Sequence, residues 1–92
     1  MNTVRNINEV NINYTVTSLG VIFINTVYIE PKLRGQGRFK QVLIELQKIY
    51  KAPIELEAFH TLVPMYEHLG FKDMNETDDQ GYHLMRRDFI PN

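Results

Sequence analysis

The sequence predicts an α/β fold: one mixed β-sheet whose elements follow the order β-β-α-β-α-β-β. Two observations predict this class. Residues 9–17 alternate between polar and apolar side chains, which is typical of a strand with one solvent-facing side. Residues 35–51 change to the spacing of a helix with one apolar face, and short strand-like segments flank this region on both sides. Strands that alternate with helices form a sheet with the helices packed on it.

The first two strands are expected at residues 9–17 and 21–29. The short turn Ser18-Leu19-Gly20 joins them, so they are antiparallel. The second strand consists almost entirely of β-branched and aromatic residues, which predicts a central position with both faces covered. Pro31 ends this strand because proline has no backbone N–H to donate. The apolar side of the first strand comprises Val10, Ile12, Tyr14 and Val16.

A helix of about four turns is expected over residues 35–51. Its apolar face comprises Phe39, Val42, Leu43, Leu46, Ile49 and Tyr50. A short strand at residues 53–58 precedes a second helix at residues 62–69, which tolerates Pro64 only in its first turn. Gly70 followed by Phe71 is a typical helix end. A weak strand at residues 71–77 and a last strand at residues 82–89 complete the sheet, joined by the turn Asp78-Asp79-Gln80-Gly81.

Length and composition limit the possible classes of protein. Residues 1–92 suit a single domain. The absence of cysteine excludes disulfides, thiolate metal sites and a cysteine nucleophile, and it favours a reducing, cytoplasmic location. No apolar run is long enough to cross a membrane, and the N-terminus lacks the apolar core of a signal peptide, so no membrane partner is expected.

The net charge of −1 hides an asymmetry between the two halves of the chain. Residues 1–52 carry seven Lys/Arg and three Asp/Glu, whereas residues 53–92 carry three and eight. The basic residues concentrate at Lys32, Arg34, Arg38 and Lys40, which indicates either a solvated face or an anion site. A nucleic-acid partner is not expected, because aromatic residues do not interleave with the basic ones and the overall balance is acidic.

The junction between the second strand and the first helix carries the strongest chemical signal. It reads Glu30-Pro31-Lys32-Leu33-Arg34-Gly35-Gln36-Gly37-Arg38. A Gly-x-Gly at a helix start presents unpaired backbone N–H groups to an anion, and two arginines add positive charge beside them. We therefore expect a pyrophosphate here, although the spacing matches neither a Walker loop nor a dinucleotide fingerprint. A glycine-rich turn without a ligand is the alternative.

Two motifs resemble those of one family. Arg34-Gly35-Gln36-Gly37, after a strand that ends at Pro31, resembles the acyl-CoA loop of the GCN5-related N-acetyltransferases, Arg/Gln-x-x-Gly-x-Gly/Ala. Met65-Tyr66-Glu67-His68-Leu69-Gly70-Phe71 resembles the family's Tyr-Glu-x-Leu-Gly-Phe. The resemblance covers roughly residues 8–90. It implies transfer of an acetyl group from acetyl-CoA, the cosubstrate, to an amine without a metal.

The resemblance also implies which residues form the site. The main chain of Val27, Tyr28 and Ile29 would bind the pantetheine arm, in a gap between this strand and residues 54–58. Tyr66 would protonate the departing CoA thiolate; the alternative for this residue is a core aromatic with its hydroxyl at the rim. The loop that would bind the pyrophosphate comprises Leu33, Arg34, Gly35, Gln36, Gly37, Arg38 and Phe39.

The chain departs from the family pattern in three places. Phe39 stands where the pattern has Gly or Ala, so it either crowds the phosphates or turns inward as the first core residue of the helix. Phe59-His60-Thr61 lacks the asparagine that the family often has near its second helix. The strand and two helices that usually open the domain and wall the acceptor site are not expected in the eight residues before the first strand. A second copy of the chain could supply that wall, so a homodimer is one hypothesis.

Other candidate residues carry weaker signals. Glu57, with Glu55 on the same strand, is a candidate base for the attacking amine, although a strand with one solvent-facing side also explains both. His60 and His68 are too few for a metal site and are expected at the surface, and His83, alone on the last strand, is expected to be either structural or exposed. Three functions stay open: an N-acetyltransferase acting on an unidentified amine, an inactive module that binds acetyl-CoA or CoA, and a protein-interaction domain.

Overall fold

A hairpin that was not predicted opens the chain. In the computed structural model, which describes residues 2–91, strand β1 (Asn2–Ile7) pairs antiparallel with β2 (Val10–Val16). Asn8 and Glu9 connect the two strands with φ angles of 53° and 64°, the positive values that a two-residue hairpin turn requires. The prediction that no strand precedes residue 9 is therefore wrong. The apolar residues of β1 do not alternate with polar ones at the period of a strand, so the sequence pattern did not reveal it, and its pairing with β2 stabilises it.

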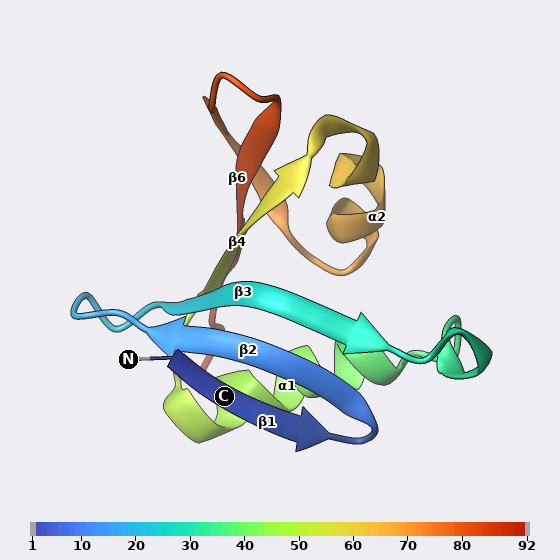
Figure 1. The fold of residues 1–92 in the computed structure, drawn as a ribbon. Helices are drawn as coiled ribbons and strands as arrows, with labels where there is room; N and C mark the ends of the chain where they lie inside the picture. Colours follow the sequence, from blue (N-terminus) through green and yellow to red (C-terminus); the bar gives the residue numbers. More distant parts are fainter. Residues whose placement is uncertain (1, 92) are drawn as a thin grey trace.

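The six strands form one sheet in the spatial order β1-β2-β3-β4-β6-β5 (Figure 1). The remaining strands are β3 (Ile22–Ile29), β4 (Ile54–Phe59), β5 (Lys72–Thr77) and β6 (Tyr82–Arg87). All neighbours pair antiparallel except β3 and β4, which are parallel. The mixed α/β class predicted from the sequence is confirmed.

Strands β3 and β4 diverge after a short contact. They pair only at Ile22 with Ile54 and at Phe23 with Glu55. Beyond this point β3 continues beside β2, whereas β4 turns away together with β6 (Figure 1). The peptide groups of β3 from Ile24 to Ile29 consequently have no strand partner on the β4 side.

Strand β3 is central but not covered on both faces, so that part of the prediction is wrong. A bulge leaves Asn25 without a partner on β2, because Ile24 pairs with Tyr14 and Thr26 pairs with Asn13. The extra residue reverses the alternation of faces along the rest of the strand. Tyr28 is therefore turned away from the core and is 52% exposed.

The two helices begin later than predicted. The first buries Val42, Leu43 and Leu46 as predicted, but Ile49 is 50% exposed, so its place on the apolar face is a wrong prediction. Helix α1 (Arg38–Tyr50) starts after Gly37, whose left-handed conformation makes it the N-cap. Helix α2 (Val63–His68) follows a 3-10 turn (η2, His60–Leu62) and has Pro64 in its first turn, as predicted. A second 3-10 turn (η1, Pro31–Leu33) follows β3. The core consists of Val10, Ile12 and Tyr14 from β2, Ile22 and Ile24 from β3, and Val42, Leu43 and Leu46 from α1, together with residues of β4 and β6 and Phe71.

The opposite face of β1–β3 is polar. Asparagine and threonine side chains form a hydrogen-bonded ladder across the three strands, joining Asn2 to Thr15, Asn6 to Asn11, and Asn25 to both Asn13 and Thr15. Neither α1 nor α2 packs on this face, because both contribute to the core on the other side. Within residues 2–91, no helix has the length and apolar character that a membrane crossing needs.

Candidate functional site

A cleft of about 510 Å³ lies where β3, the glycine-containing loop, the start of α1 and helix α2 meet. It brings together the two motifs singled out in the sequence, which are some thirty residues apart along the chain. Nine of the ten predicted cofactor-binding residues line it; the exception is Gln36, whose side-chain Nε2 donates to Lys32 O at 3.2 Å. The lining residues are Val27, Tyr28, Ile29, Leu33, Arg34, Gly35, Gly37, Arg38, Phe39, Lys40, Met65, Tyr66, His68 and Leu69.

The loop at the mouth of this cleft presents a run of free backbone donors. Among the described residues, the six N–H groups from Gly35 to Lys40 have no hydrogen-bond acceptor; the first helical bond is from Gln41 N to Gly37 O. Gly35 and Gly37 both have a φ of +76°, which L-residues with a Cβ rarely adopt. A Cβ at either position would meet no atom within 4 Å, so the space beside these amides is open. This arrangement suits a phosphate group.

Two arginines flank the free amides. Arg34 Nε donates to the carbonyl of Ile29 at 2.9 Å, and its guanidinium carbon lies 5.8 Å from the centre of the Tyr28 ring. Arg38 donates to the backbone O and the Oδ1 of Asn8, at 3.2 and 3.0 Å, which anchors the start of α1 to the β1–β2 turn. Its Nε is buried and has no partner within the described chain. A buried guanidinium N–H without an acceptor, beside open amides, indicates an anionic ligand.

Tyr66 is held at the floor of the cleft by two other aromatic rings. Its ring centroid lies 6.4 Å from that of Phe39 and 5.6 Å from that of Phe71, both in edge-to-face geometry. Phe39 thus packs against the core rather than over the loop amides, which answers the question raised by its position in the motif. Burial raises the pKa of the Tyr66 hydroxyl above its ordinary value of 10.0, so this group is protonated at neutral pH.

The free edge of β3 forms the wall of the cleft. Val27, Tyr28 and Ile29 line it, and they belong to the part of β3 that β4 does not pair. The gap between the two strands that the resemblance implied is present. Backbone N–H and C=O groups at such an edge are available to an extended ligand.

The two candidate bases on β4 differ in their surroundings. The carboxylate of Glu55 accepts a hydrogen bond from Arg86 at 3.0 Å and is therefore paired. Glu57 is exposed and lies on the face of β4 opposite to the buried Leu56 and Ala58. It does not line the cleft, so it could reach a reacting group only from the other side of the sheet.

The three histidines separate in the structure. His68 lines the cleft, together with Lys40, Met65 and Leu69; of these, only Lys40 belongs to the basic cluster that the sequence indicates as an anion site. His60 stacks on Phe59 with the ring centroids 4.3 Å apart, and His83 Nδ1 lies 3.0 Å from Asp73 Oδ2. The apolar spacing of residues 62, 65, 66 and 69 on α2 is the signal that could have indicated Met65 and Leu69. No group of three or more potential metal ligands occurs among the residues that the structure describes.

The sequence matches no protein-family model and no curated protein. Solved structures do match. The PaiA N-acetyltransferase from Thermoplasma acidophilum, in complex with coenzyme A, is 20% identical with a TM-score of 0.72, over 87% of this chain and 53% of that chain. The ribosomal-protein-S18-alanine N-acetyltransferase from Escherichia coli is 18% identical with a TM-score of 0.65, over 91% and 63%.

A third structure matches over almost its whole length. The anti-CRISPR protein AcrVA5 is 21% identical with a TM-score of 0.65, over 92% of this chain and 96% of that chain. By contrast, the chain spans between half and two thirds of the length of the two N-acetyltransferases. The chain therefore has the acyl-CoA N-acyltransferase fold of the GCN5-related N-acetyltransferases, as its two motifs predicted.

Proposed function

We propose that this chain is an acetyl-CoA-dependent N-acetyltransferase that transfers an acetyl group to an amine. The cleft that unites the glycine-containing loop with Tyr66 carries the proposal. Its free amides, its unpartnered arginine N–H and its open strand edge together suit a long ligand with a charged end and a polar, extended arm. The coenzyme A bound to the solved neighbour with this fold supports the same ligand class.

In this proposal the two ends of the cleft have separate tasks. The N–H groups of Gly35 to Lys40, with Arg34 and Arg38, bind the pyrophosphate. The peptide groups that Val27, Tyr28 and Ile29 turn away from β2 bind the pantetheine arm, as a partner strand would, although the carbonyl of Ile29 already accepts from Arg34 Nε. Acetyl-CoA supplies an acetyl group activated as a thioester. The residues of this chain orient it and exclude water from part of its length.

Tyr66 is the proposed general acid. When the amine nitrogen bonds to the acetyl carbon, the C–S bond breaks and the departing sulfur takes the proton of Tyr66 Oη. The raised pKa of Tyr66 keeps this proton in place at neutral pH. The proton lost by the amine passes to the carboxylate of Glu57, directly or through water, from the opposite face of the sheet.

Calorimetry with acetyl-CoA tests the binding site. We expect wild type to bind and Arg34→Ala and Gly37→Glu to bind at least about tenfold more weakly, because one removes a cation and the other places a carboxylate among the donors. Lys32→Ala is the matched control, since Lys32 is an exposed cation of the same loop that does not line the cleft. No heat of binding with wild type would overturn the proposal.

Measurement of turnover tests the proposed role of Tyr66 as the general acid. Once binding is established, acetyl-CoA hydrolysis or transfer with a library of amines measures the rate. Tyr66→Phe should slow turnover by about 10²-fold or more while it leaves the affinity for acetyl-CoA unchanged. Because the pKa of Tyr66 is raised, the loss of wild-type activity at high pH should fall above the ordinary tyrosine value of 10.0. An unchanged rate in Tyr66→Phe would remove the acid role.

A second candidate is an inactive module that binds acetyl-CoA, CoA or a protein partner. The near-complete match to AcrVA5, an anti-CRISPR protein of similar extent, favours a role directed at a protein. Expression in cells that carry a CRISPR system, followed by a plasmid-interference assay, tests this candidate. Relief of interference by both wild type and Tyr66→Phe would favour a binding role, and relief by wild type alone would favour acetylation of a protein amine.

We further propose that a partner covers the acceptor side of the site and that the protein acts in the cytoplasm. The polar face of β1–β3 lies uncovered, so a protein acceptor or a second copy of the chain would complete the acceptor side. Sedimentation that shows a monomer at the working concentration would remove the homodimer. A cytoplasmic location agrees with the lack of cysteine.

A further inference from the structure

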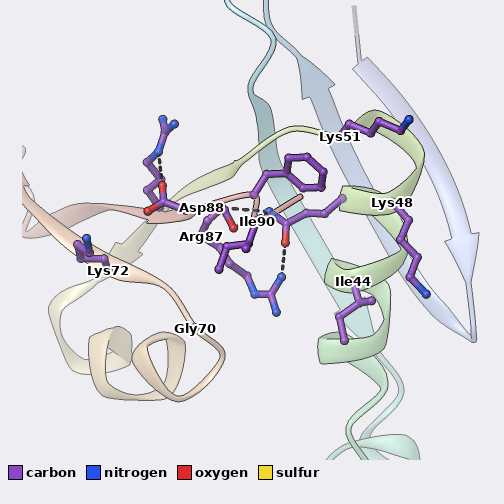
Figure 2. A pocket seen from close by; sticks show the side chains of 11 residues that line it. Ile44, Lys48, Lys51, Gly70, Lys72, Arg87, Asp88 and Ile90 are labelled. Carbon is purple, nitrogen blue, oxygen red and sulfur yellow. Dashed lines mark hydrogen bonds and ion pairs between the residues drawn. The ribbon is translucent and has the colours of Figure 1, made fainter. Parts of the chain in front are cut away.

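A second cleft, of about 620 Å³, lies at the other end of α1 (Figure 2). The C-terminal half of α1 forms one wall, and the start of β5, the end of β6 and the segment after β6 form the other. It shares no lining residue with the cleft described above. Its lining residues are Ile44, Gln47, Lys48, Lys51, Gly70, Lys72, Arg86, Arg87, Asp88, Phe89 and Ile90.

Five of these residues are cationic and one is acidic, and the two arginines are already engaged. Arg86 donates to Glu55 at 3.0 Å and to Asp88 at 2.9 Å. Arg87 donates to the carbonyl of Leu69 at 2.9 Å and to Oε1 of Gln47. The lysines Lys48, Lys51 and Lys72 are exposed and form no ion pair within the described residues.

The lysines stand on both sides of the cleft. Figure 2 shows Lys48 on α1 and Lys51 directly after it, with Lys72 on the opposite wall; Asp88 and Ile90 lie between them, and the side chains of Lys48 and Lys51 extend outward from the helix at the rim of the cleft. Interaction with the negative end of the helix dipole explains lysines at the end of α1. It does not explain Lys72, which comes from β5 and lines the same cleft. Three unpaired cations around one cleft indicate an anionic ligand.

The frame of this cleft is rigid. Gln47 is only 6% exposed, and its Nε2 donates to the carbonyls of Ala52, Arg87 and Asp88 at 3.1, 3.1 and 3.2 Å. These bonds hold the segment after β6 against α1. Phe89 and Ile90 are thereby displayed beside Ile44, and Ile90 is 80% exposed. A polar rim around an exposed apolar surface is the usual anatomy of a protein-recognition site.

We propose that this cleft binds an acidic segment of a partner protein. Carboxylates of that segment would pair with Lys48, Lys51 and Lys72, and one apolar side chain would cover Ile90 and Phe89. The charge of the cleft favours an acidic ligand. A free phosphate would contact only the lysines, whereas an acidic protein segment with an apolar side chain would also cover the apolar floor. A nucleic acid fits less well, because its backbone would extend beyond the cleft over the half of the chain that carries eight acidic and three basic residues.

Fluorescence anisotropy with a labelled peptide tests this site. The probe is a short run of glutamates around a central leucine, added to the full chain at low salt, and a second probe has serine in place of the leucine. We expect the leucine probe to bind wild type and to bind Lys48→Glu and Lys72→Glu about tenfold more weakly each. Lys32→Glu, an equal change of charge outside the cleft, should bind as wild type does. Urea unfolding checks that each variant is folded.

A further variant tests the apolar contact between the leucine of the probe and Ile90. Ile90→Ser changes a side chain that is mostly exposed, so the fold should not depend on it. This substitution should lower the affinity for the leucine probe several-fold and leave the affinity for the serine probe unchanged. No binding of the leucine probe to wild type would overturn the proposal, as would an equal loss with Lys32→Glu. Tighter binding of a single-stranded oligonucleotide that Lys48→Glu weakens would also overturn it, in favour of a nucleic-acid site.

Discussion

The ring of Phe39, at the start of α1, stands edge-on to the ring of Tyr66 on α2, with their planes at 80°. The contact joins the glycine-containing loop before α1 to the proposed acid. We expect Phe39→Ala to lower the free energy of unfolding by about 2–3 kcal/mol, because a partly buried ring is lost. It should also slow acetyl transfer, since Tyr66 loses the ring that orients it. Urea unfolding and turnover measure the two effects.

Phe39→Leu is the control for this contact, because it keeps an apolar side chain of similar volume. It should restore most of the stability and only part of the turnover rate. Equal turnover in the alanine and leucine variants and wild type would show that the ring does not position Tyr66.

Gly37 and Gly20 form a matched pair of left-handed glycines. Their φ angles are +76° and +78°, and a Cβ would meet no atom within 4 Å at either position. Alanine at either site should cost about 1 kcal/mol of stability, because of the backbone conformation alone. Only Gly37→Ala should weaken binding of coenzyme A, since its methyl group would stand where the phosphate approaches. Calorimetry of both variants measures this; equal affinities would place the phosphate elsewhere.

Gln47 carries an unusually large share of the hydrogen bonding at the end of α1. Its side chain satisfies three carbonyls and one guanidinium while it is almost completely buried. Gln47→Leu leaves these groups unpaired, and we expect a loss of about 3 kcal/mol in the free energy of unfolding. Gln41→Leu, on the exposed part of the same helix, should change it by about 0.5 kcal/mol or less. Urea denaturation of the two variants distinguishes them, and similar losses would contradict the assignment.

The carboxylate of Asp73 links stability to pH. The backbone N–H of Asn75, at 2.9 Å, and then His83 hold the pKa of Asp73 below its ordinary value of 3.8. Because the folded pKa is the lower one, the stabilisation is fully present above the ordinary value and disappears as the pH falls through the folded value. Asp73→Asn should thus be less stable than wild type at neutral pH, and the difference should shrink as the pH falls below 3.8 and disappear below the folded-state pKa. Urea midpoints over this range test it; a difference that persists in acid would point to packing instead.

Local patterns predicted much of the fold and of the candidate site. The helical spacing of Val42, Leu43 and Leu46 identified α1, because a helix must bury one face and its period is visible in the sequence. The Gly-x-Gly before α1 predicted free donors for the same reason: the geometry of a helix start is local. Strand β1 was missed because its apolar residues Val4 and Ile7 do not alternate with polar ones at the period of a strand, and because its pairing depends on β2.

The sequence by itself determined the order of elements from β2 onward, the loop that presents its amides, and the nine cleft-lining residues that lie within that loop and the strand before it. Only the tertiary structure decided how far β3 and β4 stay together, that Tyr66 meets Phe39, and that Lys72 and Lys48 line a second cleft from opposite walls. These relationships join residues that are distant in the chain. They follow from pairing register and side-chain packing, which depend on the whole sheet at once and leave no periodic pattern in the sequence.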